Sequence, residues 1–581
     1  MTLLEIQRIL LLVGIAIVAY LLVQAWVSDA EKLREAETEQ LQSTPLSSDE
    51  ATGATSEDTP QELADSSVES LDQTAANEDL DSDVPDSSML QSDRGQIMTT
   101  SSAESVSRTL IKVTTPLYYA WIDPVGGDVV GWKLIAYPIS LKEPDSPMTL
   151  LDRRADRTYI AQSGLMGEDG LDQPGGRPVY SVTRNDWNLE EGALNVKLTY
   201  EEDGVEVTKS FDFYADRYDI DVNYDVRNTS SQNFSANFFA QLKRDGGPAD
   251  GKTGGFIRPP AYVGAAITTE SKHYKRLKFK DIDKNAYREA VNGGWVAILQ
   301  HYFLSTWIPN QNESNLYFGS KDRQGNYRFG FTGPTQVITP GTSGSFGAKL
   351  YVGPKHQDAL DALAPHLALT VDYGFFWWLS VPMFKVLDWI HSLVKNWGLA
   401  IILMTILIKT VLFPLSQMSY RSMAKMRKLS PQIKRIQERF GGDRQRMGQE
   451  MMSLYQKEKT NPLAGCFPML LQMPVFFALY WVLIESVELR HAPFLFWIRD
   501  LSAMDPLFVL PILNAGVMFL MQRLNPPMPD PMQQRVMMMM PIMFGAICLF
   551  MPAGLVLYWL VNSLYSMAHH YWALKRAGAP T

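Results

Sequence analysis

The segment Ile401-Ile-Leu-Met-Thr-Ile-Leu-Ile-Lys-Thr-Val-Leu-Phe413 places one cation, Lys409, within a long apolar run. With its flanking residues it predicts a membrane-spanning helix over 396–418, because about 20 apolar residues cross the hydrocarbon layer of a bilayer. A cation inside a span costs several kcal/mol unless it reaches water, a partner or the interface. Two interpretations of Lys409 stay open. Its long stem lifts the ammonium to the inner headgroups, or the side chain faces a water-filled groove that opens to the cytoplasm.

Hydrophobic segments recur elsewhere in the chain of 581 residues. One lies at 9–27 and four lie within 463–575, at about 466–485, 506–522, 536–550 and 554–572, so six spans are predicted. Polar residues within the later segments favour a bundle with a partly wet interior; they are Gln472, Asn514, Asn562, Ser563 and Ser566. No acidic residue lies at the depth of Lys409, which disfavours a proton relay or an ion-coupled transporter.

The N-terminal residues 1–27 predict an uncleaved anchor that runs from cytoplasm to periplasm, because Arg8 precedes the apolar run and acids follow it. A cleaved signal peptide is the alternative, but its apolar region is shorter, and no clean small-x-small site follows. Residues 28–105 hold about twenty acidic residues and almost no aromatic ones. Such a segment cannot bury enough apolar area to offset chain entropy, so it predicts a disordered, acidic periplasmic tether.

Residues 106–355 show apolar residues at a period of two. The alternating positions include Val205, Val207, Phe211, Phe213, Ile220, Val222, Tyr224 and Val226. This pattern is typical of half-buried antiparallel strands, and Gly-rich turns separate the segments. An all-β sandwich domain in the periplasm is therefore predicted. It contains no metal-ligand spacing, nucleophile motif or phosphate loop in its sequence, so its own function is not visible there.

The basic stretch 419–462 separates the second and third predicted spans, and the positive-inside rule places it in the cytoplasm together with both chain termini. Apolar residues at helical spacing on both sides of Gly441-Gly442 predict a helical hairpin with a basic surface. The residues of that surface are Arg421, Lys425, Arg427, Lys428, Lys434 and Arg435. A solvated face explains these charges, and proximity to membrane phosphates or ribosomal RNA would use them too. Such uneven charge reflects membrane topology better than a DNA-binding surface.

Residues 371–395 repeat apolar side chains at helical spacing, with Lys385 and Asp388 on other faces. The pattern predicts an amphipathic helix that lies in the membrane interface. A core helix of the β domain would show the same pattern, but adjacency to the next span favours the interface.

Several ordered motifs resemble the YidC/Oxa insertase family. They are Trp397-Gly398, Phe413-Pro-Leu415, Ser422-Met-Ala-Lys-Met426, Asn461-Pro-Leu-Ala-Gly-Cys-Phe-Pro468, Leu471-Gln-Met-Pro474, Asp530-Pro-Met-Gln-Gln534 and Phe550-Met-Pro-Ala-Gly-Leu-Val-Leu-Tyr558 with Trp559 and Asn562. The first span and the large periplasmic domain resemble the Gram-negative form, whose domain is a β-supersandwich. The resemblance implies a polytopic inner-membrane protein with a five-helix insertase core.

The resemblance also implies a non-enzymatic function without a cofactor or metal. Family members hold a hydrophilic groove, open to cytoplasm and lipid, in which a positive residue attracts the polar part of a client. That residue is usually Arg and is Lys409 here, so bidentate pairing is lost. The other residues that the resemblance places along the groove are Thr405, Gln472, Tyr558, Trp559 and Asn562. The implied partners are nascent membrane proteins, the Sec translocon, the ribosome through cytoplasmic loops, and the lipid bilayer.

Two other classes of protein would leave different features in the sequence. A secondary transporter would show inverted repeats and an acid for ion coupling, and neither is visible. A membrane-anchored carbohydrate-binding or hydrolytic protein would carry paired carboxylates around a pocket of the β domain. The sequence leaves that possibility open, but it does not explain the five further predicted spans.

Overall fold

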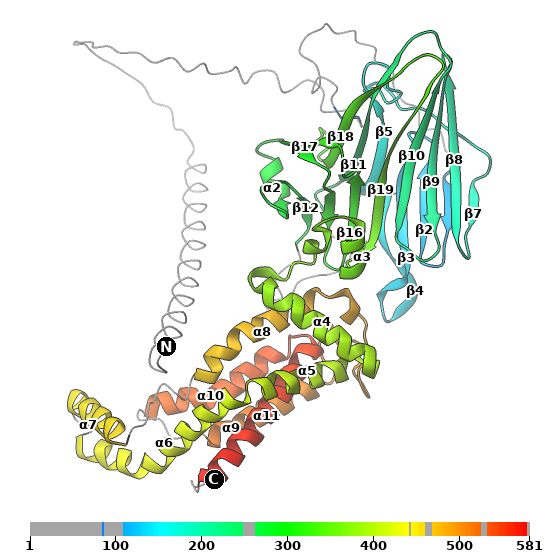
Figure 1. Cartoon of the computed structure of the whole chain (residues 1–581). Helices are drawn as coiled ribbons and strands as arrows, with labels where there is room; N and C mark the ends of the chain where they lie inside the picture. Colours follow the sequence, from blue (N-terminus) through cyan, green and yellow to red (C-terminus); the bar gives the residue numbers. More distant parts are fainter. Residues whose placement is uncertain are drawn as a thin grey trace, which may run out of the picture. The chain divides into compact units, whose positions relative to one another are not determined.

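The structure is a computed structural model of the whole chain, and it describes residues 84–85, 109–247, 262–440, 443–458, 467–524 and 531–577 (Figure 1). The predicted anchor, most of the predicted tether and the Gly441-Gly442 break lie outside the described residues. One residue of the predicted tether, Val84, is buried against Met166 and Phe239.

Two large sheets form the N-terminal domain, which confirms the predicted all-β domain. The first sheet has the order β14 (Tyr287–Asn292), β17 (Ser314–Lys321), β18 (Tyr327–Ile338), β11 (Phe234–Arg244), β5 (Arg157–Met166), β4 (Glu143–Arg154), β3 (Asp128–Ser140), β2 (Tyr118–Asp123), β1 (Ile111–Thr114) and β7 (Asp186–Asn188). The second has the order β13 (Lys275–Leu277), β12 (Gly264–Ile267), β15 (Val296–Leu299), β16 (Phe303–Pro309), β19 (Ser343–Pro354), β10 (Asp219–Asn228), β9 (Val205–Tyr214), β8 (Ala193–Glu202) and β6 (Ser181–Val182). Apart from β1 with β7, neighbouring strands within these sheets are antiparallel.

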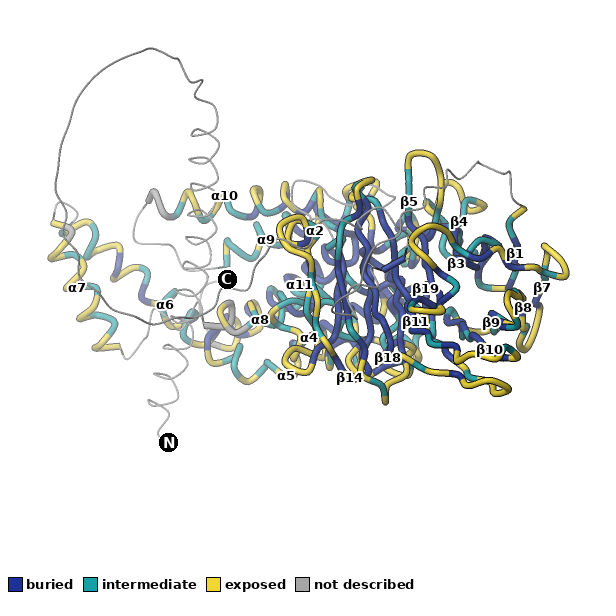
Figure 2. The backbone as a smooth tube through the Cα atoms, turned by 90° about the horizontal axis from the view of Figure 1, so that it is seen from above, coloured by how far each residue is buried: buried dark blue, intermediate teal, exposed yellow. Residues whose placement is uncertain are grey.

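The core of the domain comes from alternate residues of these strands. In β10, Ile220, Val222 and Tyr224 are fully buried, while the residues between them face outwards. Figure 2 shows the strands buried over most of their length and the turns between them exposed. Burial of these apolar side chains stabilises the sandwich by roughly 25 cal/mol for each Å² removed from water.

A cluster of charged residues lies inside this apolar core. Arg177 binds two carboxylates: its Nη1 lies 2.5 Å from Asp128 Oδ2, and its Nε lies 2.7 Å from Asp172 Oδ1. Lys209 of β9 is fully buried, and its Nζ donates to the carbonyl of Gly126 at 2.8 Å. Because a buried charge is stable only when it is paired, these four side chains depend on one another.

Lys209 should make the stability of the β domain depend on pH. Burial lowers the pKa of Lys209 from 10.5 to about 7, although the Asp128 carboxylate attracts its charge. Between pH 7 and 10.5 the unfolded chain therefore binds more protons, and the free energy of unfolding rises with pH. One proton gives a slope of at most about 1.4 kcal/mol per pH unit.

We expect the free energy of unfolding of the variant Lys209→Met to rise less steeply with pH than that of the unchanged protein. The measurement is the free energy of unfolding of both proteins by pulse proteolysis in urea, from pH 7 to 9. Parallel curves for the two proteins would show that Lys209 does not titrate in this range.

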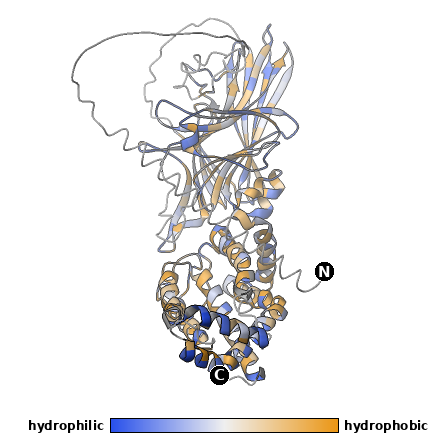
Figure 3. Ribbon diagram, turned by 90° about the vertical axis from the view of Figure 1, so that its left-hand side faces the viewer, coloured by the Kyte–Doolittle hydropathy of each residue, from blue (hydrophilic) through white to orange (hydrophobic). Residues whose placement is uncertain are grey.

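Helices make up the C-terminal region, which confirms the predicted helical part of the fold. The short helices are α2 (Phe279–Ile282), α3 (Gln357–Leu363), η2 (Leu367–Thr370), η3 (Gly374–Phe376) and η5 (Val487–Leu489). The longer helices are α4 (Trp377–Val394), α5 (Trp397–Val411), α6 (Phe413–Phe440), α7 (Arg444–Lys457), α8 (Phe467–Glu485), α9 (Val509–Leu524), α10 (Pro531–Cys548) and α11 (Ala553–Ala577). Figure 3 shows hydrophobic residues along much of these helices.

The helix that carries Lys409 is shorter than the predicted span 396–418. It ends at Val411, and α6 then continues from Phe413 in a direction bent by 68°. Pro414 explains the bend, because its ring would clash with the carbonyl four residues earlier, whereas proline is tolerated in the first turn of a new helix. The first helix of the predicted hairpin at 419–462 therefore begins earlier than predicted, at Phe413.

Apolar side chains cover much of the outer surface of the longer helices. Val411, Ile512, Met539 and Phe550 are each more than half exposed. Among the described helices, none meets the length and hydropathy of a membrane span by itself, and α5 with α6 meets them only as a bent pair. The number of spans thus stays a prediction.

Candidate functional site

Lys409 lies near the end of α5 and is only 7% exposed. Its Nζ donates two hydrogen bonds, to Gln472 Oε1 of α8 and to Ser566 Oγ of α11, both at 2.9 Å. Three helices distant in sequence therefore meet at this one ammonium group.

Helix α11 presents the other polar side chains of the cluster from a single face. Tyr558, Asn562 and Ser566 are spaced by four residues, which places them one above the other along a helix. The Gln472 Nε2 donates to the hydroxyl of Tyr558 at 3.4 Å and also to Asn562 Oδ1. Ser566 in turn donates to the carbonyl of Asn562 at 2.8 Å. The five residues Lys409, Gln472, Tyr558, Asn562 and Ser566 form what we call the Lys409 cluster.

The Lys409 cluster combines one positive charge with neutral partners. Among the described residues, the ion pairs include none between Lys409 and a carboxylate. The ammonium donates to an amide oxygen and a hydroxyl instead, so its charge is solvated by dipoles and not neutralised. Gln472 and Asn562 are half-buried, so the cluster reaches the surface through them.

Two residues predicted along the groove lie outside the Lys409 cluster. Thr405 is buried one turn before Lys409, and its hydroxyl donates to the carbonyl of Ile401 at 2.7 Å. Trp559 points to another face of α11, where it stacks on Phe476 at a centroid distance of 5.3 Å and meets Phe544 edge-on at 4.7 Å. Conversely, Ser566 was predicted only as a polar residue of the bundle, and its direct bond to Lys409 was missed.

A second polar contact joins α9 to α11. Ser563 Oγ donates to Asn514 Oδ1 at 3.2 Å, and Asn514 is fully buried. Among the described residues, the hydrogen bonds of Lys409 go to Gln472 and Ser566 and not to this pair, and such bonds commonly fix the packing of membrane helices.

The basic surface predicted for the hairpin lies on α6. Five of its six residues, Arg421, Lys425, Lys428, Lys434 and Arg435, are exposed. Arg427 differs, because it is half-buried and its Nη1 donates to the carbonyl of Leu524 at 2.7 Å. Ala424, which is buried among these basic residues on α6, packs against Leu574 of α11. The hairpin is thereby attached to the helices that carry the Lys409 cluster.

The helix predicted to lie in the interface corresponds to α4. Leu387 and Ile390 on one face are buried, whereas Trp377, Trp378 and Trp389 are each more than half exposed. Tryptophan is enriched where a protein meets the headgroups of a membrane, which supports the predicted interfacial position.

Comparison with known proteins gives two family matches that together span most of the chain. Residues 110–386 match the family described as YidC periplasmic domain, and residues 389–579 match the family described as 60Kd inner membrane protein. The membrane protein insertase YidC of Pseudomonas fluorescens is 45% identical over 580 residues, which is 99% of each chain. That of Pseudomonas putida F1 is 49% identical over 482 residues, covering 82% of this chain and 86% of the relative. A crystal structure of an active YidC insertase covers 80% of this chain and 93% of its own, with a TM-score of 0.37 and 16% identity.

Proposed function

Because this chain belongs to the YidC family of membrane protein insertases, we propose that it inserts its clients through the Lys409 cluster. The family places the protein in the inner membrane with a periplasmic domain, and its function is not enzymatic. The observation that carries the proposal is a nearly buried ammonium bound by neutral side chains from α8 and α11.

The proposed mechanism follows from the charge of this ammonium. A client segment with Asp or Glu loses its hydration when it enters the membrane, and an adjacent cation offsets part of that cost. Gln472 and Asn562 offer amide groups to polar client atoms at the surface of the cluster. A hydrated groove open to the cytoplasm would shorten the apolar path, and transfer of apolar client residues into lipid would drive the step. Thr405 and Trp559 would border this path, Trp559 through its aromatic contacts with Phe476.

The arrangement in the membrane is part of the same proposal. Six spans with both termini in the cytoplasm, the amphipathic α4 in the interface and the basic α6 hairpin in the cytoplasm agree with the distribution of Lys and Arg. The exposed cations of α6 would contact lipid phosphates or ribosomal RNA, and the Sec translocon would be a further partner.

Photo-crosslinking from two positions tests the proposal. A photoreactive phenylalanine replaces Gln472 in the cluster in one variant, and Ile512 on the outer face of α9 in the other. We expect a stalled nascent chain of a small single-span protein to crosslink strongly from position 472 and at least about tenfold less from 512. Equal yields from both positions would mean that clients contact the outer lipid-facing surface at large, and the Lys409 cluster would then not be the insertion site.

A further inference from the structure

The β domain contains a notch where one strand of each sheet stops pairing with its neighbour. In the second sheet, β16 pairs with β19 only up to Pro309, which lies opposite Ala348. In the first sheet, β17 pairs with β18 only as far as Leu316, opposite Thr332. The loop between Pro309 and Ser314 joins β16 to β17, so β16 ends and β17 begins at the same place.

Two strand edges are left open on either side of this notch. Residues 343–347 of β19 pair with β10, and residues 333–338 of β18 run beside β11. Among the described residues, neither stretch has a strand partner on its other edge. Every second residue of such an edge directs its N–H and C=O away from the sheet, which is a template for one more strand. An open edge of five residues spans about 16 Å at roughly 3.3 Å per residue.

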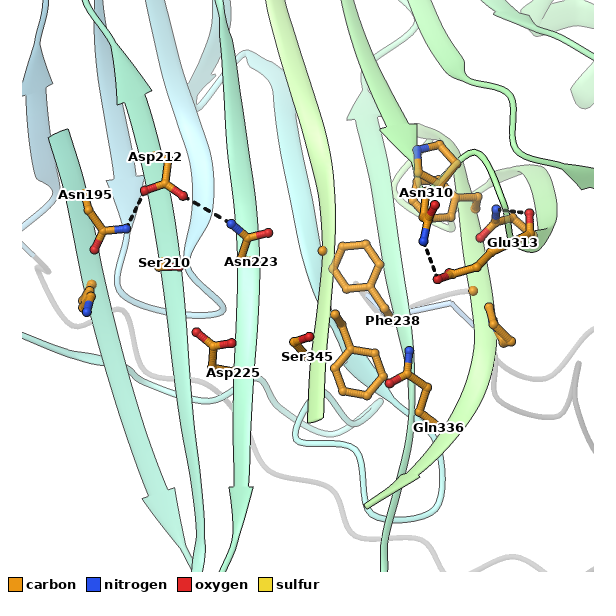
Figure 4. A pocket seen from close by; sticks show the side chains of 18 residues that line it. Asn195, Ser210, Asp212, Asn223, Asp225, Phe238, Asn310, Glu313, Gln336 and Ser345 are labelled. Atoms are coloured by element: carbon orange, nitrogen blue, oxygen red, sulfur yellow. Dashed lines mark hydrogen bonds between the residues drawn. The ribbon is translucent and has the colours of Figure 1, made fainter. Parts of the chain in front are cut away.

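A cleft of about 750 Å³ lies between the two open edges, and Figure 4 shows its lining. Phe238, Phe331 and Phe346 lie beneath it and are buried, and Ser345 on β19 is exposed at its side. The cleft thus offers the free backbone groups of a strand edge within a mostly polar lining, and main-chain hydrogen bonds to such an edge are what a strand-adding ligand uses for its affinity.

The charged side chains around the cleft are mostly acidic. Asp212, Asp225 and Glu313 line it, against the single cation Lys197. Asp212 is fixed by two amides, accepting from Asn195 at 2.6 Å and from Asn223 at 3.3 Å. Asp225 lies directly opposite Ser345 in the strand register, on the paired side of β19, so its charge lies one strand away from the open edge. A segment with Lys or Arg is therefore favoured as the occupant.

We propose that this notch binds an extended, positively charged segment of a separate periplasmic protein, which adds as a strand to the open edge of β19. The site is independent of the Lys409 cluster, and neither proposal requires the other. The chain's own segment 28–105 is disfavoured because its acids would meet the acids of the cleft. Translocated client loops are disfavoured as well, because they are depleted in Lys and Arg.

The test uses the full chain in nanodiscs of zwitterionic lipid, with empty nanodiscs as blank. The probe is a fluorescent nine-residue peptide of alternating Val and Thr, with Phe at its centre and Lys at both ends. We expect fluorescence anisotropy to show saturable binding. The same peptide with N-methyl groups on every second residue should bind at least about tenfold more weakly, because it cannot complete the backbone hydrogen bonds.

Charge variants place the binding in the notch. Asp225→Lys should raise the Kd about tenfold, whereas Glu206→Lys, an exposed charge reversal on the same face of the sheet but outside the cleft, should leave it unchanged. Equal binding of the N-methylated peptide overturns strand addition, and so does the absence of saturable binding. Binding of a chitin tetrasaccharide that is sensitive to Asp225→Lys, without peptide binding, would make the notch a glycan site. Photo-crosslinks from position 345 to residues 28–105 or to a second copy would also overturn the proposal.

Discussion

Replacing Lys409 by Leu is expected to slow insertion of a client with an acidic translocated segment by about tenfold or more. A hydrogen bond to a charged group contributes about 1.5–3 kcal/mol, and each 1.4 kcal/mol is a factor of ten. The fold should survive, because Gln472 and Ser566 keep their own bonds to Asn562 when the ammonium is removed. The measurement is protease protection of the client in proteoliposomes that contain the purified full chain.

Two comparisons separate the charge of Lys409 from its packing. Lys409→Arg should retain most of the insertion rate, and Lys385→Leu, the same change at an exposed lysine of α4, should have little effect. A client whose translocated acids are changed to Asn and Gln should be slowed less by Lys409→Leu than the acidic client. If Lys409→Leu slows the insertion of both clients by the same factor, Lys409 only holds α5, α8 and α11 together.

Replacing Arg177 by Met is expected to destabilise the β domain by about 3–5 kcal/mol. The change leaves Asp128 and Asp172 inside the core without their guanidinium partner, and removal of one partner from a buried ion pair has a penalty of this size. Pulse proteolysis of the full chain in urea would measure it as a lower unfolding midpoint of the β domain.

Arg153→Met is the matched control for Arg177→Met. Arg153 also binds a buried carboxylate, Asp123 at 2.5 Å, but its own side chain is 44% exposed and Asp123 keeps the backbone N–H of Val125, so its loss should reduce stability clearly less than the loss of Arg177. Equal losses from the two variants would contradict the special role of the buried cluster. In that case the stability of the sandwich would rest on its apolar core alone.

Much of the fold could be predicted because burial leaves a simple pattern in the sequence. The alternation at Ile220, Val222 and Tyr224 predicted strands, and the structure has β10 there. The end of α5 at Val411 was not predicted, since hydropathy continues past Pro414 while the helix does not. Lys209 occupies an inward position of β9, but the carbonyl of Gly126 that it binds and the neighbouring Arg177–Asp128 pair come from elsewhere in the chain, and no local pattern joins them.

The Lys409 cluster could be predicted in part, because some of its residues follow a local pattern in the sequence. The cation within an apolar run was visible, and the spacing of Tyr558 and Asn562 agrees with one helical face. Extending that spacing by four residues would have found Ser566. Trp559 lies on another face of α11 than Tyr558, because adjacent residues of a helix point about 100° apart, so its place along the groove stays a prediction. Which helices face Lys409 depends on packing between distant segments, which one sequence does not contain.

The neutral partners of Lys409 have a kinetic consequence for turnover. A lysine paired with an internal carboxylate would have to break an ion pair before it could bind each client. Gln472 and Ser566 can instead give way to an incoming carboxylate and return to it when the client moves on, since both have a second bond within the same cluster. Fast capture of each acidic client would therefore follow, because among the described residues no internal ion pair of Lys409 has to break first, and the association rate would be the property that this site keeps high.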